Sequence, residues 1–424
     1  MSAVNKPAGA SIRLSQCMIV KNEEKNIERA LTWAKGIAFE QIVVDTGSTD
    51  RTVEIAERMG AKVFHFKWID DFSAAKNFAI DQASGDWIAF LDADEYVSEE
   101  HARLIIPLIE NNVNFYGKNA FAFNSQLAQL RDDGSISEID RQQRFFINHP
   151  DLRYERPIHE TLRFPEEAYA LVENDILIAH TGYTHSAHIN TGKIDRNMAI
   201  LKKAVESDPE DVKSKYYLAD VHYASCNYTD AITLYRDVLN RTDCNKCAFE
   251  WFRIHAFYHL INLLNNKKVY DEAYALAEQA FHEFPERVNF CYLYGTVMYT
   301  KGRFEAALDA FKKAEKLVED GKIENQKLDN IDALPIFLAQ TYAKLDNHAE
   351  ALRYAVSYLQ SHKQREDALK LCIQLIRLKE NPENTVGFLS ILYDFKNVQN
   401  KMLLLRCAKD MGDIVLAQFL VQMN

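Results

Sequence analysis

Short apolar runs alternate with helical patterns through the first part of the chain, and this alternation constrains the fold more than any other feature. Four of the runs have the composition of buried strands and cover residues 12–20, 42–44, 63–66 and 87–91. Segments with helical spacing of apolar residues separate them, as at 72–83. A strand–helix alternation of this kind predicts an α/β domain with a largely parallel, Rossmann-like sheet.

Three of these strands run into polar residues that could share one site. KNEE follows the first strand, DTGSTDRT follows the second, and the fourth continues into FLDADEY at residues 90–96. The carboxyl ends of parallel strands form the ligand-binding edge of an open sheet. In an extended segment Asp92 and Asp94 point the same way, and carboxylate oxygens are the ligands that Mg²⁺ or Mn²⁺ prefers. The alternative interpretation is a solvated acidic turn.

Four motifs taken together resemble a known family. MIVKNEE, VVDTGSTD, FSAAKNFAI and FLDADEY occur in the order and at the intervals typical of family 2 glycosyltransferases with the GT-A fold. The resemblance covers roughly residues 11–185. Together with the helical tail of this chain, it is most similar to the sublancin-type S-glycosyltransferases, which modify peptides. The resemblance implies a nucleotide-sugar donor and a divalent cofactor, Mg²⁺ or Mn²⁺.

The resemblance also implies roles for individual residues. Asp94 would bind the metal ion, and Asp92 would approach the ribose and metal-bound water. Asp45 would accept a hydrogen bond from the ring N–H of the base, which favours uracil and therefore a UDP-sugar. His180, in IAHTGY, is the expected third metal ligand by position.

Two basic residues are expected to offer positive charge to the donor phosphates, namely Lys76 and Arg144. The family usually has arginine at the position of Lys76, so this chain departs from the pattern there. A solvated residue on a helix is the alternative interpretation of Lys76.

An inverting transfer also needs a general base on the acceptor side, poised to take a proton from a hydroxyl or thiol. Glu160 is the preferred base and His159 the second choice, because both lie in the predicted junction between donor and acceptor regions. Glu95 is an alternative base, although its place next to Asp94 is equally suited to orienting the metal ligands.

The part of the chain that follows the acidic cluster is harder to assign. We expect strands at 120–130 and 144–147, joined through a turn at Asp133-Gly134. Residues 151–186 are expected to be rich in loops. Four histidines lie within thirty residues of one another in and next to this segment: His159, His180, His185 and His188. An isolated histidine is usually structural, whereas a group of this kind beside the expected metal site suggests a functional role.

Beyond residue 193 the pattern changes to long amphipathic helices with internal similarity. The segments YTDAI, YDEAY, RFEAAL and HAEAL place an equivalent alanine at 231, 273, 307 and 351. Helix-pair repeats of about 34 residues with a small residue at the helix crossing resemble tetratricopeptide repeats. The unequal spacing indicates degenerate repeats, and a plain helical bundle is the alternative.

These patterns predict three parts. Residues 1–10 are expected to be a flexible leader, residues 11–190 the GT-A nucleotide-sugar domain, and residues 191–424 an all-α, tetratricopeptide-like helical domain. A concave helical array suits an extended peptide or protein acceptor, and it also offers a surface for a homodimer.

Charge and hydropathy limit the partners and the compartment. The net charge of −11, from 50 basic and 61 acidic residues, does not indicate a nucleic-acid-binding surface. No apolar run approaches the roughly 18 residues of a transmembrane helix, and no apolar segment follows the first residues as in a secretory signal. The expected location is the cytoplasm.

The seven cysteines are scattered and odd in number, which indicates reduced thiols. Cys244 and Cys247 form a C-x-x-C pair, and His255 with His259 could complete a zinc site. The histidines recur at helical spacing among apolar residues, so a packed helix is the favoured interpretation.

The function predicted from these observations is inverting transfer of a sugar, with UDP-sugar as the expected donor, to a Cys, Ser or Thr side chain of a peptide or protein. One alternative is transfer to a cell-envelope glycan or lipid-linked acceptor. Another is a non-catalytic repeat scaffold, which the intact Asp45, Asp92 and Asp94 disfavour. A nucleotidyltransferase would also use paired aspartates, but no Gly-rich phosphate loop precedes a helix in this chain.

Overall fold

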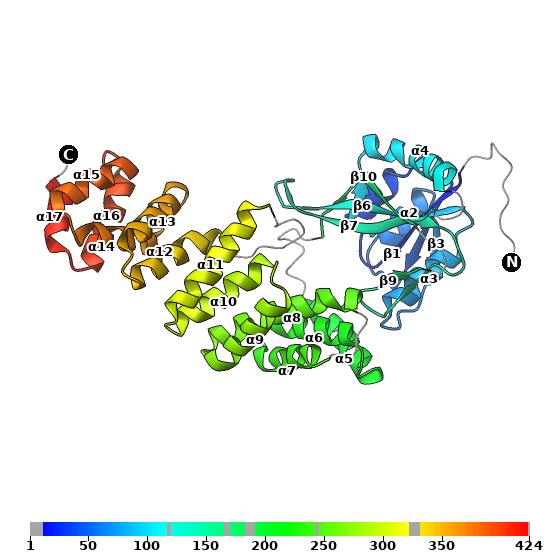
Figure 1. The fold of residues 1–424 in the computed structure, drawn as a ribbon. Helices are drawn as coiled ribbons and strands as arrows, with labels where there is room; N and C mark the ends of the chain where they lie inside the picture. The colour runs from blue at the N-terminus through cyan, green and yellow to red at the C-terminus, as the bar shows by residue number, and fades with distance from the viewer. Residues whose placement is uncertain are drawn as a thin grey trace. The chain divides into compact units, whose positions relative to one another are not determined.

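The computed structural model divides the chain into two compact units, Met1–Asp211 and Val212–Asn424 (Figure 1). The described residues are 12–116, 120–164, 170–182, 191–241, 246–321 and 331–422. The leader expected at 1–10 therefore lies outside them. The first unit is α/β and the second is all helical, which confirms the predicted fold class.

An eight-stranded sheet forms the centre of the first unit, in the order β3-β2-β1-β4-β7-β6-β10-β5. Its strands are β1 Leu14–Val20, β2 Glu40–Asp45, β3 Lys62–His65, β4 Trp87–Phe90, β5 Glu95–Val97, β6 Ala120–Leu130, β7 Ile136–Ile147 and β10 Ala170–His180. The four strands from β3 to β4 are parallel, as predicted. The other half is mixed, because β7 runs antiparallel to both β4 and β6.

Helices cover both faces of the sheet. They are α1 Ile27–Thr32, α2 Thr52–Arg58, α3 Phe72–Asp81 and α4 Glu99–Tyr116, with α5 Thr191–Ser207 closing the unit. Helix α4 packs against β6 and β10 of the mixed half. Neighbouring residues of β1 point to opposite faces, as the pleat requires. Met18 packs with Ile27 and Ile55 of α1 and α2, whereas Cys17 packs with Ile80 of α3. The result is a three-layer core that holds the carboxyl ends of the strands in place.

Two expectations about strands were wrong. β7 begins at Ile136 rather than at residue 144, and its first residues escape the apolar pattern because they are exposed. The segment expected to be loop-rich contains β10 and a two-stranded sheet of β8 Arg153–Glu155 and β9 Thr161–Arg163. A register shift between Glu173 and Leu177 interrupts the pairing of β10 with β6, and the polar residues there hide the strand from a periodicity search.

The second unit is an array of helix pairs. Its helices are α6 Val212–Ala224, α7 Tyr228–Leu239, α8 Lys246–Asn266, α9 Tyr270–Glu283, α10 Val288–Thr300, α11 Phe304–Glu319, α12 Leu334–Lys344, α13 His348–Ser361, α14 Glu366–Arg377, α15 Pro382–Leu392, α16 Val398–Asp410 and α17 Ile414–Gln422, with a short 3₁₀ turn at Ile331–Ala333. Consecutive helices pack together as α6 with α7, α8 with α9, α10 with α11 and α12 with α13. Among the described residues, no helix has both the length and the apolar character needed to cross a bilayer.

The recurring alanines mark the crossing points of these pairs. Ala231, Ala273, Ala307 and Ala351 lie on α7, α9, α11 and α13, the second helix of each pair, and all are fully buried. Gly295 of α10 is a similar close approach, because an added Cβ would lie 2.5 Å from the ring of Phe311. Small residues let paired helix backbones come close, as the sequence pattern predicted.

The turns inside five helix pairs share one conformation. A residue with positive φ lies two positions after the first helix and two before the second: Cys226, Lys268, Gly302, Asp346 and Gly412, with φ between 58° and 74°. The N–H of the next residue donates to the carbonyl five residues earlier, as from Asn227 to His222 and from Arg303 to Met298. This is the Schellman arrangement, which satisfies the last carbonyls of a helix.

Candidate active site

Two loops brace each other at the carboxyl edge of β1 and β2. The N–H of Asn22 donates to Ser48 Oγ at 2.9 Å, and the N–H of Thr49 donates to Asn22 Oδ1 at 2.7 Å. The N–H of Glu24 donates to Asp50 Oδ2 at 3.1 Å. The KNEE and DTGSTD motifs therefore hold one another, and together they form one rim of the site.

Asp45 lies beneath this rim. Its carboxylate accepts from the N–H of Gly47 at 3.1 Å and from that of Ser48 at 3.0 Å, and the side chain is buried. It is absent from the described lining of both cavities beside the site. The structure thus shows Asp45 fixing the loop, and the predicted hydrogen bond from the base to Asp45 stays a prediction.

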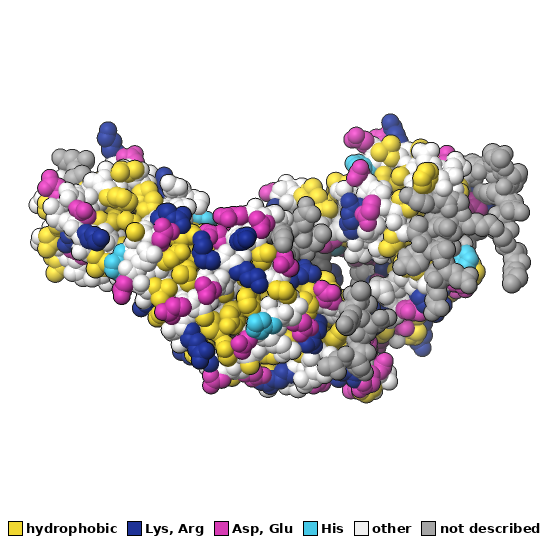
Figure 2. Space-filling model, in the orientation of Figure 1, with side chains coloured by type: hydrophobic (Ala, Val, Ile, Leu, Met, Phe, Trp, Pro, Cys, Tyr) yellow, Lys and Arg dark blue, Asp and Glu magenta, His cyan; other side chains and the backbone are white. Residues whose placement is uncertain are grey.

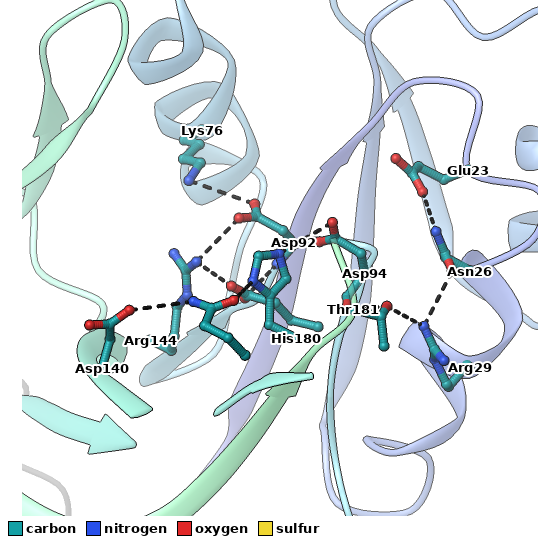
Figure 3. A network of polar contacts seen from close by, with 12 residues as sticks. Glu23, Asn26, Arg29, Lys76, Asp92, Asp94, Asp140, Arg144, His180 and Thr181 are labelled. Carbon is teal, nitrogen blue, oxygen red and sulfur yellow. Dashed lines mark hydrogen bonds and ion pairs between the residues drawn. The ribbon is translucent and has the colours of Figure 1, made fainter. Parts of the chain in front are cut away.

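Asp94 and His180 meet at the centre of the site. β10 ends at His180, and its pairing with β5 sets His180 opposite Glu95. His180 Nε2 lies 3.4 Å from Asp94 Oδ2, and Nδ1 lies 2.6 Å from the amide oxygen of Gln129. Figure 3 shows these side chains converging from different elements. The two residues assigned to the metal from sequence, Asp94 and His180, are therefore neighbours, although they are far apart in the chain.

The electrostatics of His180 follow from these contacts. Burial by itself lowers the pKa of an imidazole, but the hydrogen bond and the charge of Asp94 outweigh it and raise the pKa of His180 above its ordinary value. Because Gln129 holds Nδ1, Nε2 is the nitrogen left facing Asp94.

Asp94 and His180 fit two ligands of one hard cation. Adjacent ligands of an octahedral Mg²⁺ lie about 3 Å apart, close to the separation of Asp94 Oδ2 and His180 Nε2. A Cβ added at Gly182 would lie 2.5 Å from His180 Nε2 and would also overlap Asp94, so glycine keeps this space open. Within the described part of the chain, no group of three or more His, Cys, Asp or Glu side chains is placed so that it could hold a metal ion by itself. Further ligands would have to come from water and substrate phosphates, as is usual for Mg²⁺.

Lys76 is an almost fully enclosed charge of the site. Its side chain is 4% exposed, and Nζ lies 2.6 Å from Glu160 Oε1 and 3.7 Å from Asp92 Oδ1. The rings of Phe90 and Tyr154 flank the ammonium group at 5.3 and 5.1 Å. Burial would lower the pKa of Lys76, but Asp92 and Glu160 raise it, so the ammonium form is stabilised. Lys76 is therefore not a solvated helix residue.

Helix α3 is hydrogen-bonded to the segment that carries Glu160, and this positions Lys76 beside it. The N–H of Phe72 donates to the carbonyl of Pro157 at 2.8 Å, and Asn77 exchanges two hydrogen bonds with the backbone of Tyr154 at 2.9 and 2.8 Å. The motif FSAAKNFAI thus acts through its backbone and amide contacts as well as through its lysine.

Arg144 joins the first and the last acid of the FLDADEY motif, Asp92 and Glu95. It donates to Asp92 Oδ2 at 3.2 Å and to Glu95 Oε1. Burial raises the pKa of Glu95, whose side chain is 1% exposed. Burial would also raise the pKa of Asp92, but Lys76 and Arg144 lower it to about 2. Glu95 is thus the buried partner of Arg144, and its other oxygen accepts from the N–H of Asp92.

Two cavities meet at these charges. The larger has a volume of about 1040 Å³ and lies along the ends of β1 and β4. The smaller, of about 530 Å³, lies between β7 and the β8–β9 segment. Both are lined by Phe72, Lys76, Asp92, Glu160, His180 and Arg196. Four of these shared lining residues were predicted from the sequence as site residues: Lys76, Asp92, Glu160 and His180.

The two proposed bases lie between β8 and β9. Glu160 lines both cavities, whereas His159 lines only the smaller one. Arg156 and His159 both have positive φ, at 83° and 51°, which is uncommon for residues other than glycine and clusters at functional sites. His185 and His188, also noted in the sequence, lie outside the described residues.

A polar chain along the larger cavity was not anticipated. Asn26 Nδ2 donates to Glu23 Oε2 at 2.7 Å, and Arg29 donates to Asn26 Oδ1 at 3.2 Å and to Thr181 Oγ1 at 2.9 Å (Figure 3). Thr181 in turn donates to the carbonyl of Asp94. The KNEE motif was the available signal, but the contact between Arg29 and Thr181 joins segments that sequence spacing does not relate.

The C-x-x-C pair cannot be placed, since Cys244 and the side chain of Cys247 lie outside the described residues. His255 stacks on Trp251 with centroids 3.9 Å apart, and His259 stacks on Tyr235 at 5.6 Å. These contacts agree with the interpretation of a packed helix. The five described cysteines are free thiols.

Several known proteins each resemble part of the chain. A TPR repeat-containing protein of Synechococcus elongatus is 35% identical over 214 residues, covering 48% of this chain and 50% of that protein. An uncharacterized glycosyltransferase of Rickettsia bellii is 48% identical over 88 residues, covering 21% and 30%. The SPbeta prophage-derived glycosyltransferase SunS of Bacillus subtilis is 26% identical over 203 residues, covering 47% of each. The chain spans half or less of the length of these relatives.

Family models match stretches of both units. Residues 15–165 match glycosyl transferase family 2, and residues 187–243 and 262–321 match the tetratricopeptide repeat. The repeat match begins before α5, although α5 lies in the first compact unit. The resemblance found in the sequence is thereby confirmed: the chain joins a family 2 glycosyltransferase domain to tetratricopeptide repeats.

Proposed function

We propose that the first unit transfers a sugar from a nucleotide sugar, preferentially a UDP-sugar, to a Cys, Ser or Thr side chain of a peptide or protein, with inversion. The observation that carries this proposal is the pair of polar cavities that share Lys76, Asp92, Glu160 and His180. A transferase has to bring two substrates to one point, and a shared wall of charged groups provides such a point.

The larger cavity suits the donor. It lies at the carboxyl edge of the parallel strands, where open α/β sheets bind nucleotides. Its basic lining suits a diphosphate and consists of Lys21, Lys25, Arg29, Lys76, Lys193 and Arg196. Arg144 lines only the smaller cavity and reaches the donor side through Asp92.

Mg²⁺ or Mn²⁺ is the proposed cofactor, with Asp94 and His180 as its protein ligands. When bound, such an ion supplies Lewis-acid stabilisation of the charge that develops on the departing diphosphate. Asp92 is held in place by Lys76 and Arg144, which suits the role of orienting the donor next to that ion.

Glu160 is the proposed general base. The acceptor oxygen or sulfur forms a bond to the anomeric carbon of the donor sugar and gives its proton to the Glu160 carboxylate. At the same time the bond between the anomeric carbon and the diphosphate oxygen breaks, which releases the nucleoside diphosphate. Lys76 holds Glu160 at 2.6 Å and so fixes the carboxylate between the cavities. His159, which lines the smaller cavity, is the alternative.

The helical unit is proposed to bind the acceptor protein or a second copy of the chain. Figure 2 shows hydrophobic side chains gathered over α15 and α16. The last three helices expose Ile391, Val398, Met402, Ile414, Val415 and Val421. Exposed apolar surface of this kind marks interaction sites, and light scattering at increasing concentration would show whether the partner is a second copy.

The free thiols also favour a reducing compartment, the cytoplasm.

The test is hydrolysis of a panel of nucleotide sugars by the full chain with Mn²⁺, Mg²⁺ or a chelator. We expect metal-dependent cleavage of a UDP-sugar that Asp94→Asn abolishes and Asp133→Asn, at an exposed hairpin turn, leaves unchanged. Glu160→Gln should retain donor binding but lose transfer to an acceptor. If no nucleotide sugar binds or is cleaved, the proposal is wrong.

A further inference from the structure

Three basic side chains line both cavities, and they differ in how their charge is balanced. They are Lys76, His180 and Arg196. Carboxylates face the first two: Glu160 Oε1 lies 2.6 Å from Lys76 Nζ, and Asp94 Oδ2 lies 3.4 Å from His180 Nε2. Within the part of the chain that the structure describes, Arg196 forms no ion pair. The protein therefore supplies a counter-charge at two of these positions and none at Arg196.

The guanidinium of Arg196 is held in place by neutral groups. It lies over the ring of Phe72, with Cζ 5.0 Å from the ring centroid. Nε and Nη2 donate to Oδ1 of the neighbouring Asn197, at 3.3 and 3.2 Å, whereas Nη1 donates to no described residue. The side chain is half-buried, and burial lowers the pKa of Arg196 because it disfavours the charged form. A partly desolvated cation with unused donors is suited to an anionic ligand.

Helix α5 carries Arg196 and is fixed to the first unit by contacts of its own. Lys203 Nζ, two turns further along α5, lies 2.6 Å from Asp70 Oδ2. Trp68 Nε1 donates to the other oxygen of Asp70 at 3.0 Å. Asp70 lies in the loop that leads into α3, and α3 begins at Phe72, the ring under Arg196. The helices that carry Lys76 and Arg196 are thus joined through one loop.

The place of Arg196 in the chain separates it from the glycosyltransferase motifs. The family 2 match ends at residue 165, and the first repeat match covers 187–243. Arg196 lies inside the repeat match, although α5 belongs to the first compact unit. The order of the glycosyltransferase motifs does not extend to this residue, which is why sequence analysis did not single it out.

We propose that Arg196 binds the phosphate that carries the sugar and stabilises the negative charge that develops on it as the sugar leaves. This rests on the proposed function and assigns a further catalytic residue to it. The first helix of the repeat match would then complete the donor site.

The chemistry of the leaving group fits this assignment. When the bond from the anomeric carbon breaks, its electron pair stays on the phosphate oxygen, and no proton leaves the arginine. The sugar passes from the donor to the acceptor, so this phosphate has to lie where the two cavities meet, and Arg196 lines both of them. A guanidinium offers parallel N–H groups that match phosphate oxygens.

Binding of three ligands to the full chain separates the terminal phosphate from the rest of the nucleotide. Uridine, UMP and UDP are titrated by calorimetry with and without Mn²⁺, or the matching set for whichever nucleotide sugar proves to be cleaved. We expect Arg196→Met to weaken UDP about tenfold, the effect of losing a hydrogen bond to a charged group, and to leave uridine and UMP unchanged. Arg196→Lys keeps the charge but loses the paired N–H groups, so its UDP affinity should lie between the two.

Hydrolysis and unfolding distinguish catalysis from a structural role. Arg196→Met should lower the kcat of donor hydrolysis about 100-fold, as loss of one donor to a developing negative charge does. The unfolding midpoint should stay the same or rise, because methionine removes a half-buried charge and still packs on Phe72. Lys202→Met, exposed on the same helix, is the control and should keep both UDP affinity and hydrolysis.

Three outcomes would overturn the inference. If Arg196→Met binds UDP and hydrolyses the donor like the unchanged chain, Arg196 does not contact the phosphate, and the proposed function still stands. If uridine, UMP and UDP are all weakened equally and the unfolding midpoint falls, the role of Arg196 is structural. If the unchanged chain binds no nucleoside diphosphate and cleaves no nucleotide sugar, the proposed function fails and this inference fails with it.

Discussion

The two units of this chain are held together in different ways. The first unit brings charged side chains from distant segments together at one site. Each of these ion pairs is of a different kind: Lys76 with Glu160, Arg144 with Glu95, and Asp94 with His180. The second repeats a few apolar contacts and one turn along an array. When a contact that occurs once is removed, no similar contact replaces it. When one contact of a repeated series is removed, the others of the series remain. The first unit should therefore be the more sensitive to single changes.

The largest effect is expected from Arg144→Met. It leaves the buried carboxylate of Glu95 without its partner, and breaking a buried ion pair costs about 3–5 kcal/mol of the free energy of unfolding. Urea unfolding followed by tryptophan fluorescence in a Trp251→Phe background measures it, because the other tryptophans are all in the first unit: Trp33, Trp68 and Trp87.

The matched change in the helical unit is Arg365→Met. Arg365 and its partner Asp367 are 51% and 44% exposed, and a pair this accessible contributes little. Hydrogen exchange of α14 should stay as in the unchanged chain. Equal losses from the two variants would contradict the contrast between the units.

Gly182→Ala should reduce metal-dependent donor hydrolysis by about 100-fold while leaving the unfolding midpoint unchanged. The new methyl group would displace Asp94 and His180, and misplacement of reacting groups by about 1 Å has an effect of this size. Gly134→Asn, at the tip of the β6–β7 turn where an added Cβ meets nothing, is the control and should keep full hydrolysis. A stability loss without a catalytic loss would refute this assignment.

Gly295→Ala tests the packing of the repeats. Its methyl group would enter the ring of Phe311, and overpacking of this kind costs about 1–3 kcal/mol. In Gly387→Ala, within α15, the methyl group meets open space and should stabilise that helix by about 1 kcal/mol. The midpoint of thermal unfolding of each variant is the measurement. If both midpoints shift in the same direction, helix propensity rather than close packing controls the stability of the array.

The affinity of the first unit for Mn²⁺ should depend on pH through His180. A proton and a metal ion compete for Nε2, and the pKa of His180 is raised despite its burial because Asp94 favours the charged form. Affinity is therefore expected to fall about tenfold per pH unit below that pKa, starting above pH 6.5, the ordinary value. The protonated pair stabilises the metal-free fold at low pH, and this stabilisation is lost as pH rises through the pKa. Calorimetric titration measures the affinity, and a His180→Asn variant with the same slope would contradict the prediction.

The smallest effects are expected in the turns. Lys268 and Asp346 have positive φ, which costs a residue with a side chain about 1 kcal/mol relative to glycine. Lys268→Gly should raise the stability of the helical unit by about that amount, and Gly302→Ala should lower it similarly. Urea midpoints of the two variants should move in opposite directions, and a loss in both would show that these turns are not equivalent.

Much of this could be predicted from sequence, wherever local pattern decides the outcome. Apolar runs located β1 to β4, and motif order located Asp94 and His180, which do meet. The rest depends on contacts between distant segments. Nothing local shows that Lys76 pairs with Glu160, that the oxygens of Asp45 serve their own loop, or that polar residues 136–143 continue β7. An exposed strand lacks the apolar alternation by which strands are recognised.

The shared turn of the helix pairs bears on how such a chain can change in length over evolution. Since five helix pairs close with the same backbone geometry, such a pair can be copied or deleted as a block and its neighbours still meet the same surface. A single inserted residue, by contrast, would break the Schellman hydrogen bonds at that turn. The length of the array can thus grow or shrink by whole helix pairs while the first unit stays as it is.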